Sequence, residues 1–191
     1  MAARPSRPHL TRRTRESVIA AVRESLQEGS FHTSRVEDIA HRAGVSRASV
    51  YQHFGSRVGL VDALCESFDR NPALVAIRGT SDLDEMIEQT VAFWAAEEEV
   101  LRQLYGAAAV DLAAGELVER QRRDRRSELR RVAGQKVAGD RALFAQLLAL
   151  TSFETFVELH RLGGLSVREV SRVLKEAARD ALGAKGMLRG R

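Results

Sequence analysis

The sequence predicts an all-α protein built from a small N-terminal module and a larger C-terminal one. Its 191 residues are enough to give both parts a buried core. Only 3 prolines occur, and the chain is rich in alanine, leucine, arginine and glutamate, which favour helix. Apolar side chains recur at intervals of three and four along successive segments, the pattern of helices that each bury one face.

The N-terminal part predicts a long helix followed by a short one. Residues 11–29 carry an apolar stripe and finish at Gly29, a residue type common at helix C-termini. Ser34 and Glu37 have the spacing of a capping box, in which each side chain accepts a hydrogen bond from the other residue's backbone. A second helix is therefore expected to open at Ser34 and to end at Gly44.

A third and a fourth helix are expected to follow closely. Ser46 is a favourable N-cap for a helix that continues to Phe54. A Gly-Ser interruption then precedes a fourth helix that begins near Arg57. Asn71 and Pro72 should stop or kink that helix, because a proline nitrogen cannot donate a hydrogen bond.

The second and third helices have the spacing of a helix-turn-helix, a motif that places its second helix in the major groove of DNA. Ala40 is small where the two helices cross, and Gly44 permits the left-handed backbone of the turn. Val45 and Val50 fill the junction. The other side chains of the third helix, from Arg47 onward, should then face outward.

These outward side chains are suited to DNA contacts. Arg47 can pair with guanine, Gln52 with adenine, and Ala48 can touch a thymine methyl group. Tyr51 has a hydroxyl that can reach a phosphate, and the start of the second helix is suited to anions. The predicted DNA-binding residues are Arg12, Arg13, Thr33, Ser34, Arg35, Ser46, Arg47, Ala48, Ser49, Tyr51, Gln52, His53 and Arg57.

Basic charge is concentrated at the N-terminus. A net charge of +4 with a pI near 9.8 would confer only solubility if it were spread evenly. Instead, several arginines precede Glu16, the first acidic residue. They are Arg4, Arg7, Arg12, Arg13 and Arg15. We expect this arm to follow the DNA backbone or to enter a minor groove.

The run from Phe31 to Arg57 resembles the DNA-binding signature of TetR-family regulators. The matching elements are Ile39-Ala40, Ala43-Gly44-Val45-Ser46, Tyr51 and His53-Phe54, followed by Leu60. Gly59 departs from the resemblance, because such proteins commonly carry a helix-favouring Glu there, and the fourth helix should start less firmly.

The resemblance implies a three-helix DNA-binding head, a connecting helix and a helical domain that binds an effector and dimerises. We place these parts at residues 1–55, 56–71 and 72–191. It also implies a homodimer on a near-palindromic operator in double-stranded DNA, most commonly a repressor released by a small apolar or amphipathic ligand. The alternative is a regulator whose C-terminal domain serves only dimerisation or protein docking, with no small-molecule inducer.

Five further helices are expected beyond a Gly-Thr-Ser turn at residues 79–81. They cover residues 82–96, 97–114, 116–137, 140–162 and 166–182. The second of these is interrupted at Gly106. Ser166 and Glu169 form another capping box, which opens the last helix.

The last two of these helices are candidates for a dimer interface. Residues 140–162 are apolar on more than one side and residues 166–182 carry a narrow apolar seam, so both need packing partners. A second copy of the pair would give a two-fold four-helix interface, whereas packing within the chain is the competing explanation. The candidate interface residues are Leu143, Leu147, Leu150, Val157, Val167, Val170, Leu174, Ala177 and Ala181.

A ligand pocket would draw on apolar groups from several helices, with Tyr105 able to orient the ligand. The candidate pocket residues are Phe93, Trp94, Leu104, Tyr105, Phe144, Leu148 and Phe153. Aromatic residues at helical spacing are more often ordinary core. The arginine-rich helix over 116–137 also contains interleaved acidic residues, which favours a solvated face with local ion pairs over a second DNA-binding patch.

Enzymatic and membrane functions find little support. The five histidines are scattered and lack metal-ligand spacing with Cys65, and no nucleophile elbow, phosphate loop or dinucleotide fingerprint occurs. We therefore expect no catalysis, metal or cofactor. No apolar run approaches the roughly 20 residues of a membrane span, and the N-terminus lacks the apolar region of a signal peptide, so a cytoplasmic location is expected.

Overall fold

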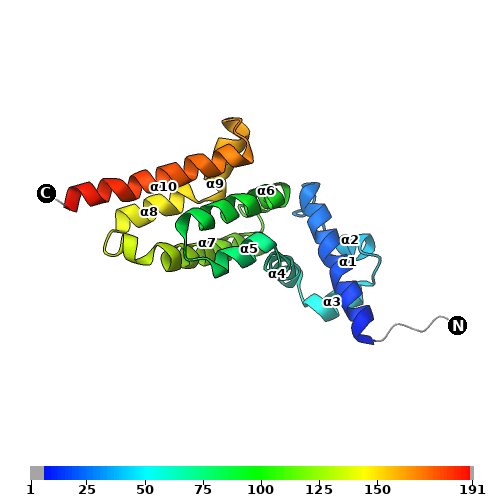
Figure 1. Ribbon diagram of the computed structural model, residues 1–191. Coiled ribbons are helices and arrows are strands. Elements are labelled where there is room, and N and C mark those ends of the chain that lie inside the picture. Colours follow the sequence, from blue (N-terminus) through cyan, green and yellow to red (C-terminus); the bar gives the residue numbers. More distant parts are fainter. Residues whose placement is uncertain (1–6, 190–191) are drawn as a thin grey trace. The chain divides into compact units, whose positions relative to one another are not determined.

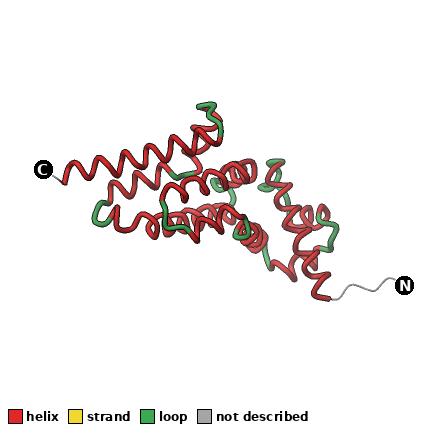
Figure 2. Tube along the Cα trace, in the orientation of Figure 1, coloured by secondary structure: helices red, strands yellow, loops and turns green. Residues whose placement is uncertain are grey.

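The computed structural model of this chain consists of helices joined by short loops (Figure 1). The structure describes the backbone of residues 7–189 and the side chains of residues 12–184. Within residues 7–189 there is no strand, which confirms the all-α class; Figure 2 shows the helices and loops along the trace. The side chains of Arg4 and Arg7 lie outside the described residues.

The chain divides into two compact units, which are described separately below. The first comprises Met1–Asp69 and Glu99–Arg120, and the second comprises Arg70–Glu98 and Gln121–Arg191. Residues 99–120, which were expected in the C-terminal domain, belong to the first unit.

Four N-terminal helices belong to the first unit. They are α1 (Arg7–Gln27), α2 (Val36–Arg42), α3 (Arg47–Phe54) and α4 (Arg57–Phe68). Helix α1 packs against α2 and α4, and α3 packs against the same two helices. Val22, Ile39, Val50 and Leu64 are each buried on the inward face of one of these helices. The apolar stripes expected from the sequence thus form one shared core.

The turn between α2 and α3 follows the sequence expectation at its glycine and at its second cap. Gly44 has φ +67°, a left-handed conformation in which a side chain would be strained. Ser46 precedes α3, and its Oγ accepts the backbone N–H of Ser49 at 3.1 Å. The two helices therefore meet as a helix-turn-helix.

The expected capping box at the start of α2 is wrong by one residue. Arg35, not Ser34, immediately precedes α2, and its backbone N–H donates to Asp38 Oδ2 at 2.7 Å. The Ser34 hydroxyl instead donates to the carbonyl oxygen of Ser30 at 2.9 Å. Ser34 is thus used by the preceding turn, and Asp38 takes the place that Glu37 was expected to fill.

Helices α6 (Leu83–Ala107) and α7 (Leu112–Ala133) each contribute to both units, with residues 83–98 and 121–133 in the second. The other segments of the second unit are α5 (Pro72–Gly79), the 3-10 turn η1 (Gly134–Val137), α8 (Arg141–Leu150), α9 (Phe153–Val157), the π turn η2 (Glu158–Leu162) and α10 (Val167–Arg189). Helices α8 and α10 pack together. Leu129, Leu147, Phe156 and Leu174 are fully or almost fully buried.

Several C-terminal helix boundaries differ from the sequence expectation. Helix α6 runs through residue 97 without a break and contains Gly106, and α10 continues through Gly183. Residues 140–162 do not form one helix, because the Thr151 hydroxyl donates back to Leu147 O at 2.9 Å and Ser152 caps a new helix. The capping box of Ser166 and Glu169 is confirmed, with the Ser166 N–H donating to Glu169 Oε2 at 2.8 Å.

Among the described residues, no single helix is long and apolar enough to cross a membrane. Helix α8 and the segment from Phe153 to Leu162 meet the length and composition criteria only as a pair, bent by 47°.

Candidate nucleic-acid interface

Helix α3 presents one buried face and one polar, accessible face. Val50 and Phe54 point into the core of the first unit. On the other side, Ser46, Arg47, Ala48 and Gln52 are exposed, whereas Ser49 and His53 are half-buried. Tyr51 is 41% exposed, so its ring is accessible on the same side. The residues predicted to contact base edges therefore share one accessible surface, which we call the α3 face.

Arg47 pairs with a carboxylate at the start of the α3 face. Its Nε lies 2.8 Å from Glu37 Oε1 of α2, and its guanidinium lies 5.3 Å from the centre of the Tyr51 ring. The Arg47 and Glu37 side chains are 62% and 43% exposed, so solvent weakens their pairing. Arg47 can leave Glu37 at little cost and offer the same N–H groups to a phosphate or a guanine.

The start of α2 provides the other predicted contacts. Thr33 and Arg35 are exposed, and Ser34 is half-buried. The Thr33 hydroxyl donates to Ser30 O at 3.0 Å, the same carbonyl that accepts from Ser34. Both hydroxyl protons are therefore used inside the protein, although the oxygens can still accept hydrogen bonds.

Arginines of α1 occupy two kinds of environment. Arg12 and Arg13 are exposed, and Arg12 pairs with Glu16 at 2.9 Å on its own helix. Arg15 instead reaches Glu66 of α4 at 2.5 Å, and its guanidinium lies over the Phe54 ring. The first two remain accessible to a polyanion, whereas Arg15 connects α1 to α3 and α4.

Arg57 has a structural role that the sequence analysis did not predict. Its guanidinium donates to Phe31 O at 2.5 Å and to Ser34 O at 2.6 Å, and it pairs with Asp111 at 2.9 Å. These bonds occupy the groups that were expected to meet a phosphate. Asp111 gave no local signal in the sequence, because it follows Arg57 by 54 residues.

A further pair near the turn was also missed. Arg42, the last residue of α2, donates to Glu28 Oε1 at 2.7 Å. This hydrogen bond lowers the pKa of the Glu28 carboxyl and raises the pKa of Arg42. The pair joins the end of α2 to the loop after α1, which helps to fix the helix-turn-helix on α1.

The residues predicted to line a ligand pocket are divided between the two units. Leu104 and Tyr105 belong to the first unit, whereas the other five belong to the second. Trp94 packs against Phe93 and Phe153 at ring-centre distances of 5.2 and 5.4 Å. Phe144 and Leu148 instead line a separate pocket beside Arg126 and Arg130. Within the second unit, the predicted residues thus form an aromatic cluster around Trp94 and part of a pocket beside Arg126 and Arg130, whereas Leu104 is buried in the first unit.

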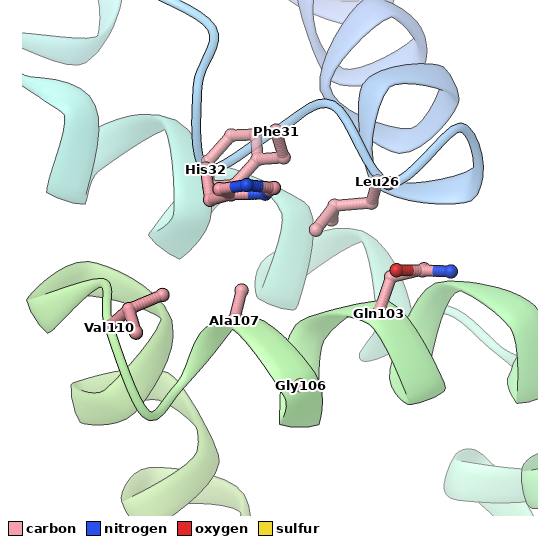
Figure 3. A pocket seen from close by; sticks show the side chains of 8 residues that line it. Leu26, Phe31, His32, Gln103, Gly106, Ala107 and Val110 are labelled. Atoms are coloured by element: carbon pink, nitrogen blue, oxygen red, sulfur yellow. The ribbon is translucent and has the colours of Figure 1, made fainter.

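Another pocket lies within the first unit (Figure 3). It has a volume of about 250 Å³ and combines the end of α1 and the residues that follow it with the end of α6 and the turn after α6. Its lining includes Leu26, Phe31, His32, Gln103, Ala107 and Val110. None of these residues was predicted to line a pocket, because the two groups are far apart in the sequence.

The predicted dimer-interface residues fall into two groups. Leu143, Leu147, Val170 and Leu174 are at most 6% exposed within the single chain, so they form its own core. The remaining residues are half-buried: Leu150, Val157, Val167, Ala177 and Ala181. Packing within the chain therefore accounts for the first group, and only the second leaves surface for a partner.

Comparisons with known proteins agree with this geometry. Residues 18–64, which run from the C-terminal half of α1 through most of α4, match the family described as bacterial regulatory proteins, tetR family. A search of curated proteins finds no match.

Solved structures share the fold at low sequence identity. A transcriptional regulator from a Rhodococcus species superimposes with a TM-score of 0.63 and 19% identity, covering 89% of this chain and 96% of that one. A protein assigned as a transcriptional regulator from Pseudomonas aeruginosa superimposes with a TM-score of 0.66 and 19% identity, covering 98% of this chain and 97% of that one. One assigned to the TetR family from Mesorhizobium loti has a TM-score of 0.61 and 17% identity, covering 94% of this chain and 98% of that one. The match over residues 18–64, which contain the helix-turn-helix built from α2 and α3, identifies this part of the chain as a DNA-binding domain of the TetR family of bacterial regulatory proteins.

Proposed function

We propose that the protein binds a near-palindromic operator as a homodimer and represses transcription from it. The observation that carries the proposal is the α3 face, where Arg47, Ala48, Tyr51 and Gln52 are accessible together on a helix fixed by its buried side. Arginine and glutamine in these positions are able to read guanine and adenine in a major groove. Arg12 and Arg13 add positive charge on α1 for the phosphate backbone.

A dimer is needed because one short helix reads too few base pairs for tight binding. Two heads joined by a stable interface bind half-sites roughly 34 to 36 Å apart, and the second contact becomes intramolecular. We assign the interface to the outer sides of α8 and α10, where Leu150, Ala177 and Ala181 are incompletely buried. The helices of two copies would form a four-helix packing.

Release by a small apolar or amphipathic ligand is the second part of the proposal. Trp94 supports it, because its Nε1 is buried and has no hydrogen-bond partner among the described residues. A buried donor without an acceptor is costly, and a ligand oxygen would satisfy it. The ligand would act through its different affinities for two conformations of the dimer.

The alternative is a regulator whose C-terminal domain only dimerises or docks a protein. The close packing of Phe93, Trp94, Phe153 and Phe156 favours this version, because it fills the interior where a ligand was expected. In both versions the protein acts in the cytoplasm, without catalysis and without a membrane.

Selection of DNA by the purified full-length protein tests the proposal directly. Random duplexes should yield an enriched site with two inverted half-sites, and sedimentation of the protein on that site should give two copies per duplex. Enrichment of a single unrepeated half-site, occupied by one copy, would contradict the dimeric reading. Failure to enrich any sequence at low salt would contradict the DNA-binding function itself.

A further inference from the structure

The arginines of α7 that belong to the second unit differ in what holds them. Arg122 pairs with Glu154 at 3.0 Å, and Arg131 pairs with Glu128 at 2.8 Å. Arg125 donates to Leu148 O at 2.6 Å. Arg126 and Arg130, in contrast, form no ion pair with any carboxylate that the structure describes. The expectation of a face covered by local ion pairs therefore does not describe these two residues.

Arg126 and Arg130 converge on one aromatic ring. Their guanidinium carbons lie 5.9 and 4.9 Å from the centre of the Phe144 ring of α8. Phe144 is 8% exposed, so the ring forms a nearly closed apolar surface under both cations. A guanidinium held over a ring can keep the N–H groups at its edge available for a carboxylate or a phosphate.

The same residues border a pocket of about 470 Å³, formed by the end of α7, the η1 turn and the start of α8. Its lining combines Arg126, Arg130 and Arg141 with the apolar side chains of Val137, Phe144 and Leu148. The volume is within the range of small-molecule sites. Cationic groups and an apolar wall thus face one space.

Acidic charge in this pocket is limited. Asp140 belongs to the lining, but its Oδ1 accepts the backbone N–H of Leu143 and thereby caps α8. Three arginines against one carboxylate leave the pocket with a positive surplus. An uncharged apolar molecule would leave these cations without a partner, and a small inorganic anion would leave the wall of Phe144 and Leu148 uncovered.

We propose that this pocket, which we call the Phe144 pocket, binds an amphipathic anion: a molecule with a carboxylate or phosphate group and an apolar tail. The anionic group pairs with Arg126, Arg130 and Arg141, and the tail covers Val137, Phe144 and Leu148. The site is distinct from the aromatic cluster of Phe93, Trp94 and Phe153. It depends on neither DNA binding nor dimerisation.

Isothermal titration of the full-length protein with decanoate tests the site, at concentrations below those at which decanoate forms micelles. Decanoate should bind with one site per chain, whereas 1-decanol and acetate should each bind at least roughly tenfold more weakly, because each lacks one half of the interaction. Equal affinity for decanoate and 1-decanol would overturn the anionic specificity. Absence of decanoate binding would overturn the site.

Two matched pairs of variants locate the binding. Ala145 and Ala142 are both exposed on α8, but only Ala145 lines the pocket. Ala145→Glu should weaken decanoate binding at least roughly tenfold, whereas Ala142→Glu should not. Arg130→Gln should weaken it as well, and Arg123→Gln, a change at an exposed arginine of the same helix outside the pocket, should not. Unchanged binding in both Ala145→Glu and Arg130→Gln would overturn the proposal.

Discussion

Arg57 and Asp111 form an ion pair that connects the first residue of α4 to the turn between α6 and α7. Nη2 of Arg57 lies 2.9 Å from Oδ2 of Asp111, and the two side chains are 25% and 11% exposed. The same guanidinium binds the carbonyl oxygens of Phe31 and Ser34 and lies 4.0 Å from the centre of the Phe31 ring. One side chain thus fixes three segments of the first unit.

Replacing Arg57 should destabilise the first unit strongly. Arg57→Ala leaves Asp111 and two carbonyl groups without their partner in a largely buried position, and we expect a loss of about 3 kcal/mol in the free energy of unfolding. Chemical denaturation measures it. Asp111→Asn is the matched change. In the wild type, Asp111 Oδ1 accepts the backbone N–H of Ala114 at 3.1 Å, and asparagine keeps an oxygen that can accept it.

The two changes should not be additive. In the Arg57→Ala background, Asp111→Asn should cost at least about 1 kcal/mol less than it does in the wild type, because the ion pair is already lost. Additive losses in the double-mutant cycle would show that the pair makes no specific contribution.

Gly59 provides a second prediction. A Cβ atom at this position would lie 1.8 Å from the carbonyl oxygen of Phe54, so α4 and the end of α3 approach each other too closely for any side chain. Gly59→Ala should therefore destabilise the protein by at least about 1 kcal/mol, although alanine favours helix.

Gly106 is the control for that change. It also lies within a helix, but a Cβ there would meet nothing within 4 Å. Gly106→Ala should raise the free energy of unfolding by about 0.5 to 1 kcal/mol. If both substitutions were stabilising, the close approach at Gly59 would be refuted.

The capping box of α10 should make stability depend on pH. Hydrogen bonds from the Ser166 hydroxyl and backbone N–H lower the pKa of the Glu169 carboxyl. Because the pKa is lower in the folded state than in the unfolded state, the ionised carboxylate stabilises the fold at pH values above its unfolded-state pKa of about 4.3. That contribution is lost as the pH falls through the folded-state pKa.

Thermal unfolding across this range tests the cap. The melting temperature of Glu169→Ala should be lower than that of the wild type at neutral pH, and the difference should shrink below about pH 4. Glu176→Ala, at another exposed glutamate of α10, controls for the general effect of removing a carboxylate. A difference that stayed constant down to strongly acidic pH would rule out the charged hydrogen bond as its source.

The helix-turn-helix could be predicted because its signals are local. Gly44 and Ser46 act on their own turn, and the apolar spacing of α1 to α4 matches the buried residues. The break at Thr151 and Ser152 was missed because the apolar pattern continues across it, although a serine N-cap was present. Continuous apolar spacing predicts burial and does not by itself establish one unbroken helix.

Interactions between distant segments gave no such signal. Arg57 meets Asp111 across 54 residues, so an arginine at a helix start was assigned to phosphate binding instead. The apolar seam of α10 could not distinguish a partner chain from the chain's own core, and Val170 and Leu174 turned out to be core residues. Helical periodicity gives the face that is buried, but not what covers it.

The most direct test of the central claim is the affinity of the purified protein for its selected DNA site, measured by fluorescence anisotropy. Arg47→Ala and Gln52→Ala should each weaken binding at least roughly fivefold, while circular dichroism and the melting temperature stay unchanged. Arg123→Gln, at an exposed arginine of α7, should bind as the wild type does. If both α3 variants bound the site with wild-type affinity, the assignment of the α3 face to DNA would be contradicted.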